Sequence, residues 1–224
     1  MPTVLTIAGF DPSSGAGVTA DLMVFAAHGL FGTACIAALT VQSTLGVRSM
    51  HPTPASVVGD TLACLQADLP PEGIKIGMVS NVDNINRICD YLDKLRQTHD
   101  NHHPVAVVLD PVLRSTSGRE LLDPTGTLLL RERLLPLVDW ITPNLDELGV
   151  LAGLPVARSE HLPTACRALQ AAIAQAAPRT VHQNRLVSVE RIDFDSHVTI
   201  LSCPLNKNQT TVRSMYKDLS ITVG

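Results

Sequence analysis

The segment around residues 7–22 has the residue types needed to bind a small polar ligand. An apolar run at residues 4–8 leads into a loop that contains Asp11, a proline and two serines, and the loop ends at Gly15-Ala16-Gly17. Backbone N–H groups at such a strand-to-helix turn can converge on a ligand, and the helix N-terminus adds a partial positive charge. We therefore expect Asp11 and Gly17 to belong to a binding site.

Two nucleotide-binding motifs can be compared with this loop. A Walker A loop requires a lysine followed by Ser or Thr after its last glycine, and no lysine lies near Gly17. Residues 15–20 match G-x-G-x-x-A, the dinucleotide fingerprint, but residues 37–40, where an acid should end the second strand, contain none. A dinucleotide-dependent oxidoreductase therefore remains an alternative function with little support beyond the glycines.

Three polar residues after later apolar runs are suited to phosphate and metal chemistry. Asp110 directly follows the run 105–109, where its carboxylate could approach a metal-bound phosphate or cap a turn. Asn144 and Glu147 follow the run 138–141 and, three residues apart, share one helix face. Their oxygen atoms could hold the waters of a hydrated Mg²⁺, or they could cap the helix.

Gln42 and Met78 also follow strand-like runs and are further candidates for a ligand contact. A glutamine carboxamide offers both a donor and an acceptor, and a methionine side chain is polarisable. From the residues alone, a surface amide is the favoured interpretation of Gln42, and Met78 could be a core residue.

Alternating apolar runs and helical patterns must position these residues. The alternation is typical of a mostly parallel sheet that is covered by helices on both faces. Ligands of such sheets bind at the carboxyl ends of the strands. We therefore expect one shared site formed by the polar residues that follow the runs, namely Asp11, Gln42, Met78, Asp110 and Asn144.

Residues 9–22 read G-F-D-P-S-S-G-A-G-V-T-A-D-L and resemble the hydroxymethylpyrimidine/phosphomethylpyrimidine kinases of the ribokinase-like superfamily, whose loop reads G-[ST]-D-P-S-G-G-A-G-x-x-A-D-L. Residues 142–147 match the T-P-N-x-x-E signature of the superfamily in full, and residues 75–78 and 110–112 resemble further family stretches. Phe10 and Ser14 depart from the loop pattern, and Ser14 loses the conformational freedom of a glycine if its φ is positive.

The resemblance implies a ribokinase-like three-layer α/β/α sandwich and a phosphotransferase. The implied reaction is ATP-dependent phosphorylation of 4-amino-5-hydroxymethyl-2-methylpyrimidine and its monophosphate in thiamine biosynthesis, with ATP and Mg²⁺ as cofactors; a pyridoxine-type alcohol stays open as substrate. The residues that match the family's sites are, for the substrate, Asp11, Gly17, Gln42 and Met78; for phosphate and nucleotide, Asp110, Asn144 and Glu147; and for Mg²⁺, Asp110 and Glu147.

The resemblance covers roughly residues 3–175 and does not extend to the remainder. No glycine lies between Gly153 and Gly224, so the family's Gly-Thr-Gly-Cys loop, which forms an anion hole and carries the presumed base, is not found. We expect a kinase domain at residues 1–176, incomplete on its C-terminal side, and a divergent tail at 177–224 with strands near 185–192 and 197–201. Catalytic residues stay unassigned, and a catalytically impaired or non-catalytic pyrimidine-binding remnant is the main alternative.

Composition narrows the class of partner. The net charge of −4 argues against nucleic acid, because phosphate backbones are bound by clustered Lys and Arg. No uncharged apolar run is long enough for a membrane span. The five cysteines are odd in number and form no C-x-x-C pair, which is typical of reduced, mostly buried thiols in a cytoplasmic protein. The partner that the family resemblance implies is a small pyrimidine alcohol, and a homodimer is left open.

Overall fold

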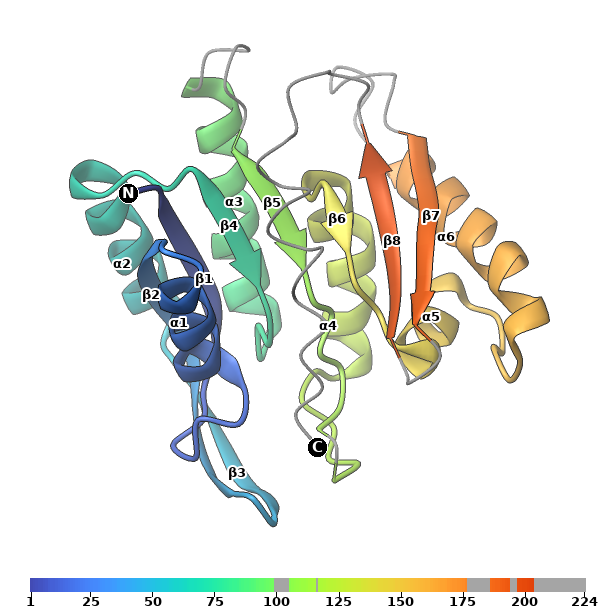
Figure 1. Cartoon of the computed structure of the whole chain (residues 1–224), viewed down its shortest axis with the longest axis horizontal. Helices are drawn as coiled ribbons and strands as arrows, with labels where there is room; N and C mark the ends of the chain where they lie inside the picture. Colours follow the sequence, from blue (N-terminus) through green and yellow to red (C-terminus); the bar gives the residue numbers. More distant parts are fainter. Residues whose placement is uncertain (99–104, 116, 177–185, 194–196, 204–224) are drawn as a thin grey trace.

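The computed structural model describes residues 1–98, 105–115, 117–176, 186–193 and 197–203 (Figure 1). Eight strands form one sheet in the order β3-β2-β1-β4-β5-β6-β8-β7. Strands β2, β1, β4, β5 and β6 are parallel to one another, whereas β3 at one edge and β8 and β7 at the other are antiparallel to their neighbours. The bounds are β1 (Thr3–Phe10), β2 (Phe31–Ser43), β3 (Gly46–Pro52), β4 (Gly73–Ile76), β5 (Ala106–Leu109), β6 (Trp140–Ile141), β7 (Leu186–Asp193) and β8 (His197–Cys203).

Helices lie on both faces of the sheet, as the sequence predicted (Figure 1). Helix α1 packs on one face, where a side chain at Gly32 of β2 would collide with Leu22 and Phe25. The other helices cover the opposite face. The helical bounds are α1 (Gly17–Ala27), α2 (Ala55–Asp68), α3 (Val82–Thr98), α4 (Pro124–Leu129), η1 (Leu130–Leu134), η2 (Leu135–Leu137), α5 (Leu145–Ala152), η3 (Ser159–His161) and α6 (Leu162–Ala176).

The main core lies between the sheet and the larger helical layer. Alternate strand residues face it, because side chains of a strand alternate between the two faces of a sheet. Helix α3 contributes four buried side chains to this core, Ile85, Ile88, Leu92 and Leu95. The largest fully buried side chains include Leu5, Ile7, Leu62, Ile76, Ile85, Ile88, Leu92, Leu109, Leu130, Leu134, Leu135 and Leu148.

Helix α3 is capped by Asn81 and not by the preceding residue, Ser80. The helix begins at Val82, and the side-chain oxygen of Asn81 accepts the backbone N–H of Asn84 at 2.9 Å. Ser80 has a positive φ of 72° and donates its hydroxyl to the Ala37 carbonyl at 3.1 Å. The Ser80 hydroxyl is bonded to β2 and does not cap the helix, and Asn81 is the capping residue.

The two strands expected after residue 177 are present at 186–193 and 197–203. They extend the sheet, because β8 pairs with β6 through Trp140 and Ile141. The proposed division of the chain at residue 176 stays a prediction, and most of the segment 177–224 lies outside the described residues. None of the helices in the described part of the chain has the length and apolar character needed to cross a membrane.

Candidate functional site

The loop at residues 11–16, here called the Asp11 loop, is organised by the carboxylate of Asp11. One oxygen accepts the backbone N–H and the hydroxyl of Ser13 at 2.8 and 2.7 Å. The other oxygen accepts the backbone N–H groups of Gly15 and Ala16 at 3.1 and 3.0 Å. Asp11 is 4% exposed. Its two oxygens therefore hold the loop in shape, and any contact with a substrate would add to this role.

Two residues of the loop region have left-handed backbone conformations. Gly17 has φ +63°, and a Cβ atom there would overlap the carbonyl oxygen of Gly9. Ser14 has φ +59°, in agreement with the conformation that the family's glycine suggested. A side chain is excluded at Gly17 by space as well as by conformation, whereas Ser14 carries only the conformational cost.

Met78 packs directly beneath the end of β1. A Cβ atom at Gly9 would overlap the Met78 Cε atom, so the glycine leaves space for this side chain. Met78 is 8% exposed and forms a small apolar cluster with Ala38 and Leu121, separate from the main core. The cluster lies at the carboxyl ends of the strands, which is where a ring-binding surface would be needed.

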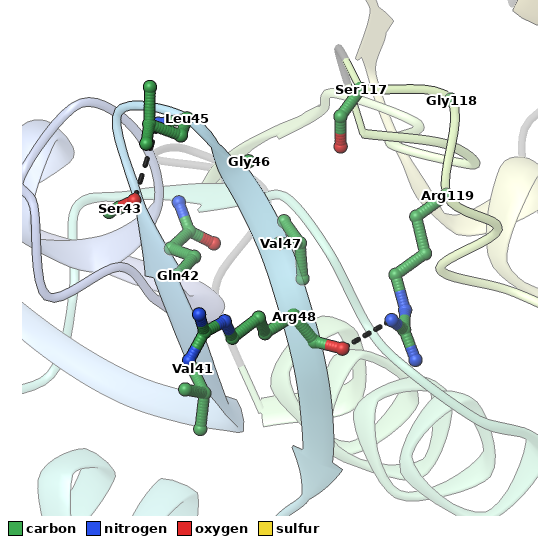
Figure 2. A pocket seen from close by; sticks show the side chains of 10 residues that line it. All are labelled: Val41, Gln42, Ser43, Leu45, Gly46, Val47, Arg48, Ser117, Gly118 and Arg119. Carbon is green, nitrogen blue, oxygen red and sulfur yellow. Dashed lines mark hydrogen bonds between the residues drawn. The ribbon is translucent and has the colours of Figure 1, made fainter.

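Gln42 lies near the carboxyl end of β2 and is connected through Thr40 to the end of β1, just before the Asp11 loop. The Thr40 hydroxyl is 2.8 Å from the Phe10 carbonyl oxygen and 2.8 Å from the Gln42 Oε1 atom. A hydroxyl has one proton, so it donates to one of these oxygens at a time. Gln42 also lines a cavity of about 720 Å³ between the β2–β3 hairpin and residues 117–119 (Figure 2).

Asp110 follows β5, and its carboxylate faces the cation of Lys75 on β4. The Lys75 Nζ atom lies 4.0 Å from Asp110 and 3.0 Å from Asp21 of helix α1. Asp21 also accepts the hydroxyl of Thr6 on β1 at 2.6 Å. Lys75 therefore links the face of the sheet under α1 with the end of β5, and 38% of the Asp110 side chain is exposed.

Asn144 and Glu147 form a reciprocal capping box at the start of α5. The Asn144 side chain accepts the backbone N–H of Glu147 at 2.8 Å, and the Glu147 carboxylate accepts that of Asn144 at 2.8 Å. The capping role considered from the sequence is therefore confirmed for both residues. The capping box uses the Asn144 side-chain oxygen and one Glu147 oxygen. Any binding of Mg²⁺ by these residues would have to occur with the capping box in place.

The environment of Glu147 favours its neutral form. Burial raises the pKa of this carboxyl to about 7, and the negative charge of Asp110 adds to the shift. The backbone N–H groups of Asn144 and Leu113 oppose it. A nearby cation would reverse this balance. The structure thus brings Asp110, Asn144 and Glu147 together at the ends of β5 and β6, and Asp11, Gly17 and Met78 together at the ends of β1 and β4.

The cysteines also match the expectation for their described side chains. Cys35, Cys89 and Cys166 are buried and free, and Cys64 is exposed and free. Burial raises the pKa of the Cys35 and Cys89 thiols to about 12, which favours the protonated, less nucleophilic form at neutral pH.

Residues 48, 75 and 119 contribute to this end of the molecule, and the sequence analysis gave none of them a role. The alternation of burial in β4 places Lys75 opposite the core-facing isoleucines, on the face that α1 covers. That alternation was visible in the sequence, whereas the pairing of Lys75 with Asp21 depends on the strand register. Arg48 and Arg119 meet only through the approach of the hairpin to residues 117–119.

Solved structures with this arrangement are small-molecule kinases of the ribokinase-like α/β fold. The phosphomethylpyrimidine kinase of Clostridium difficile 630 superposes with a TM-score of 0.70 and 30% identity, covering 90% of this chain and 81% of that chain. The pyridoxal kinase of Staphylococcus aureus, solved in complex with ADP, superposes with a TM-score of 0.65 and 27% identity over 84% of this chain and 68% of that chain. The fold therefore places this chain in the same class of protein.

The chain belongs to the phosphomethylpyrimidine kinase family, whose model matches residues 11–189. The hydroxymethylpyrimidine/phosphomethylpyrimidine kinase of Haemophilus influenzae is 40% identical over 168 residues, which are 75% of this chain and 60% of the relative. The corresponding Escherichia coli protein is 40% identical over 157 residues, 70% of this chain and 56% of that protein. The chain thus spans less than two thirds of the length of these curated relatives.

Proposed function

We propose that this chain binds 4-amino-5-hydroxymethyl-2-methylpyrimidine and its monophosphate and takes part in their phosphorylation by Mg-ATP in thiamine biosynthesis. The observation that carries the proposal is the packing of Met78 against Gly9, just before the Asp11 loop, with Gln42 joined to the same end of β1 through Thr40 and Phe10. This arrangement lies in a chain that matches the family model over residues 11–189. The buried, reduced thiols support a cytoplasmic location.

Each residue on the ring side has a role that its chemistry supports. Gln42 would read the ring nitrogen and amino group with its acceptor and donor. Met78 would lie against the ring, where its sulfur is polarisable. Asp11 would hold the loop, and the missing side chain at Gly17 would let the backbone approach the ligand. These roles depend on the ring lying between the loop and the Met78 cluster.

The carboxylates at the ends of β5 and β6 fit a hydrated magnesium ion. The described residues contain no group of three or more His, Cys, Asp or Glu side chains placed to hold a metal by themselves. Mg²⁺ is commonly held by one or two carboxylates, waters and substrate phosphates, so Asp110 and Glu147 would be sufficient as protein ligands. When bound, the ion would neutralise negative charge on the transferring phosphate.

We expect slow turnover by this chain alone. Its sequence contains no Gly-Thr-Gly-Cys loop, because residues 154–223 contain no glycine. Removing one donor to a developing oxyanion costs roughly 10²–10³ in rate, and a whole loop supplies several such donors. Binding of the pyrimidine should be affected less than the chemical step, since the ring-side residues are all present.

A coupled assay of ADP release tests the proposal. The wild-type chain with Mg-ATP and the pyrimidine alcohol should release ADP faster than a Glu147→Ala variant. Calorimetry should detect binding of the alcohol to the wild-type chain in the absence of ATP. A Gln42→Ala variant should lose most of the binding heat. Wild-type chain that neither binds the alcohol nor exceeds the Glu147→Ala rate would contradict the proposal.

A further inference from the structure

The cavity beside Gln42 has a strongly cationic lining. Its walls come from the β2–β3 hairpin and residues 117–119, and they include Arg48 and Arg119 but neither aspartate nor glutamate (Figure 2). Serine hydroxyls from both walls, Ser43 and Ser117, add neutral donors. A cavity of about 720 Å³ is within the range of about 300–1,000 Å³ that is typical of small-molecule sites.

The two arginines are placed by specific backbone features. Val41 pairs with Ser49 and Gln42 pairs with Val47, so Arg48 is the extra residue of a β-bulge in β3. Bulges redirect side chains and are frequent beside active sites. Arg119 is held from the opposite wall, because its Nη1 atom donates to the backbone carbonyl of Arg48. That one bond uses a single donor of a guanidinium that has five.

Neither arginine forms an ion pair with a carboxylate in the part of the chain that the structure describes. By contrast, Arg96 and Arg133 on the helical face are each within 3.6 Å of an aspartate. Glu120 is next to Arg119 in the chain, but it does not line the cavity. Two guanidinium groups beside one cavity without an acid in its wall favour an anionic ligand, and Arg binds phosphate in a bidentate geometry.

We propose that this cavity binds the phosphate group of the pyrimidine monophosphate, with Arg48 and Arg119 as the residues that favour the monophosphate over the alcohol. The inference rests on the proposed function, since Gln42 lines the same cavity and would hold the ring. A phosphate monoester carries close to two negative charges at neutral pH, whereas the alcohol is uncharged. The arginines would therefore distinguish the two substrates by charge.

Calorimetric titration of both pyrimidines into single variants tests the assignment. Arg48→Gln and Arg119→Gln should each raise the dissociation constant of the monophosphate by roughly tenfold to a hundredfold, which is the size expected for hydrogen bonds to a charged group. The ratio of the monophosphate and alcohol dissociation constants should change by about the same factor. Arg119→Lys, which keeps the charge without the fork, should fall between wild type and Arg119→Gln.

Arg167→Gln is the matched control, because Arg167 is an exposed arginine on α6 outside the cavity. It removes the same charge and should leave both dissociation constants unchanged. Raising the ionic strength from about 0.05 M to about 0.5 M should weaken binding of the monophosphate more than binding of the alcohol in the wild type. Melting curves of the variants separate loss of binding from loss of folding.

Each contrary outcome has a distinct meaning. Arginine variants that weaken both pyrimidines equally, or neither, would overturn the assignment and leave the proposed function standing. Variants that lose affinity for ATP but retain affinity for the monophosphate would assign the arginines to nucleotide phosphates and also overturn it. A wild-type chain that binds neither pyrimidine would reject the proposed function and this inference together.

Discussion

Asp11 and Glu147 are both buried carboxylates at a turn between a parallel strand and a helix, but the protein uses them differently. Asp11 accepts four hydrogen bonds, three from backbone N–H groups and one from a hydroxyl, so its charge is well compensated. Glu147 accepts two backbone N–H groups, from Asn144 in its capping box and from Leu113, but it lies near the charge of Asp110 and its burial raises the pKa to about 7.

The difference separates a structural carboxylate from one that is suited to a cation. A carboxylate that is saturated with backbone donors gains little from an additional partner. A carboxylate that is buried beside another negative charge gains much from a nearby cation. The comparison therefore assigns loop organisation to Asp11 and leaves Glu147 as the acid to which Mg²⁺ would matter. The following predictions test the two sides of this comparison.

The largest effect is expected at Gly17, which allows the Asp11 loop to approach β1. Gly17→Ala should destabilise the protein by more than about 3 kcal/mol or abolish pyrimidine binding, because the Cβ atom overlaps the Gly9 carbonyl oxygen. Gly29→Ala is the matched control: its φ is +69°, and no atom lies within 4 Å of the added Cβ. Chemical unfolding should show a loss of only about 1 kcal/mol for the control. Equal losses would mean that the contact with Gly9 is unimportant.

The next effect concerns the charge of Asp11. Each Asp11 oxygen accepts hydrogen bonds from one pair of donors. In Asp11→Asn one of these oxygens is replaced by an NH₂ group, which cannot accept them. Leaving two buried donors without an acceptor should lower the free energy of unfolding by roughly 2–4 kcal/mol. Urea unfolding at neutral pH measures the loss. A variant as stable as the wild type would show that the loop does not depend on the carboxylate.

The same acid-to-amide change at Glu147 should raise the free energy of unfolding at high pH, whereas at Asp11 it should lower it. The native pKa of about 7 exceeds the ordinary value of 4.5, so the native state binds more protons between these values. The contribution of the neutral Glu147 carboxyl to the free energy of unfolding is fully present below about pH 4.5, and it is lost as the pH rises through about 7. Glu147→Gln can keep the capping box through its amide oxygen, but its NH₂ group cannot accept the Leu113 N–H. The variant should therefore be more stable than wild type at pH 8 by at most about 3 kcal/mol.

Urea unfolding of Glu147→Gln and wild type in metal-free buffer measures this difference. The advantage of the variant should be small at pH 4.5 and should reach its full size above pH 7. An advantage that is the same at both pH values would show that the carboxyl is not neutral in the folded protein.

The smallest effect is expected at Ser14. Ser14→Gly should stabilise the protein by about 0.5–1 kcal/mol, because φ is +59° and a glycine adopts this conformation without strain. Ser80→Gly is the informative control, since Ser80 has φ +72° but its hydroxyl also bonds to Ala37 and Asn84. Thermal melting should show a gain for the first variant and a loss for the second. A loss for Ser14→Gly would mean that its hydroxyl or its rigidity is needed.

Much of this site could be predicted because local patterns specify it. Strand-like runs followed by polar residues indicated where Asp11, Asp110 and Asn144 lie, and the glycine of the family motif suggested that Ser14 could have a positive φ. Family knowledge supplied the suggested ligand. The pattern also indicated both strands after residue 177, although it did not indicate that they would pair with β6.

The parts that could not be predicted depend on contacts between distant segments. The ion pair of Lys75 with Asp21 requires the register of β1 and β4, and the exposure of Arg48 to the cavity requires a bulge in β3. The pKa of Glu147 depends on burial by several elements and on its distance from Asp110. None of these quantities is encoded in a short stretch of sequence.

The central claim is that the Asp11 loop, Gln42 and Met78 form one surface for a pyrimidine ring. A crystal structure of the chain with 4-amino-5-hydroxymethyl-2-methylpyrimidine tests it most directly. The account predicts that the ring lies within hydrogen-bond distance of the Gln42 carboxamide and in contact with the Met78 side chain. A ring bound elsewhere, or bound here without contact to Gln42, would contradict the account.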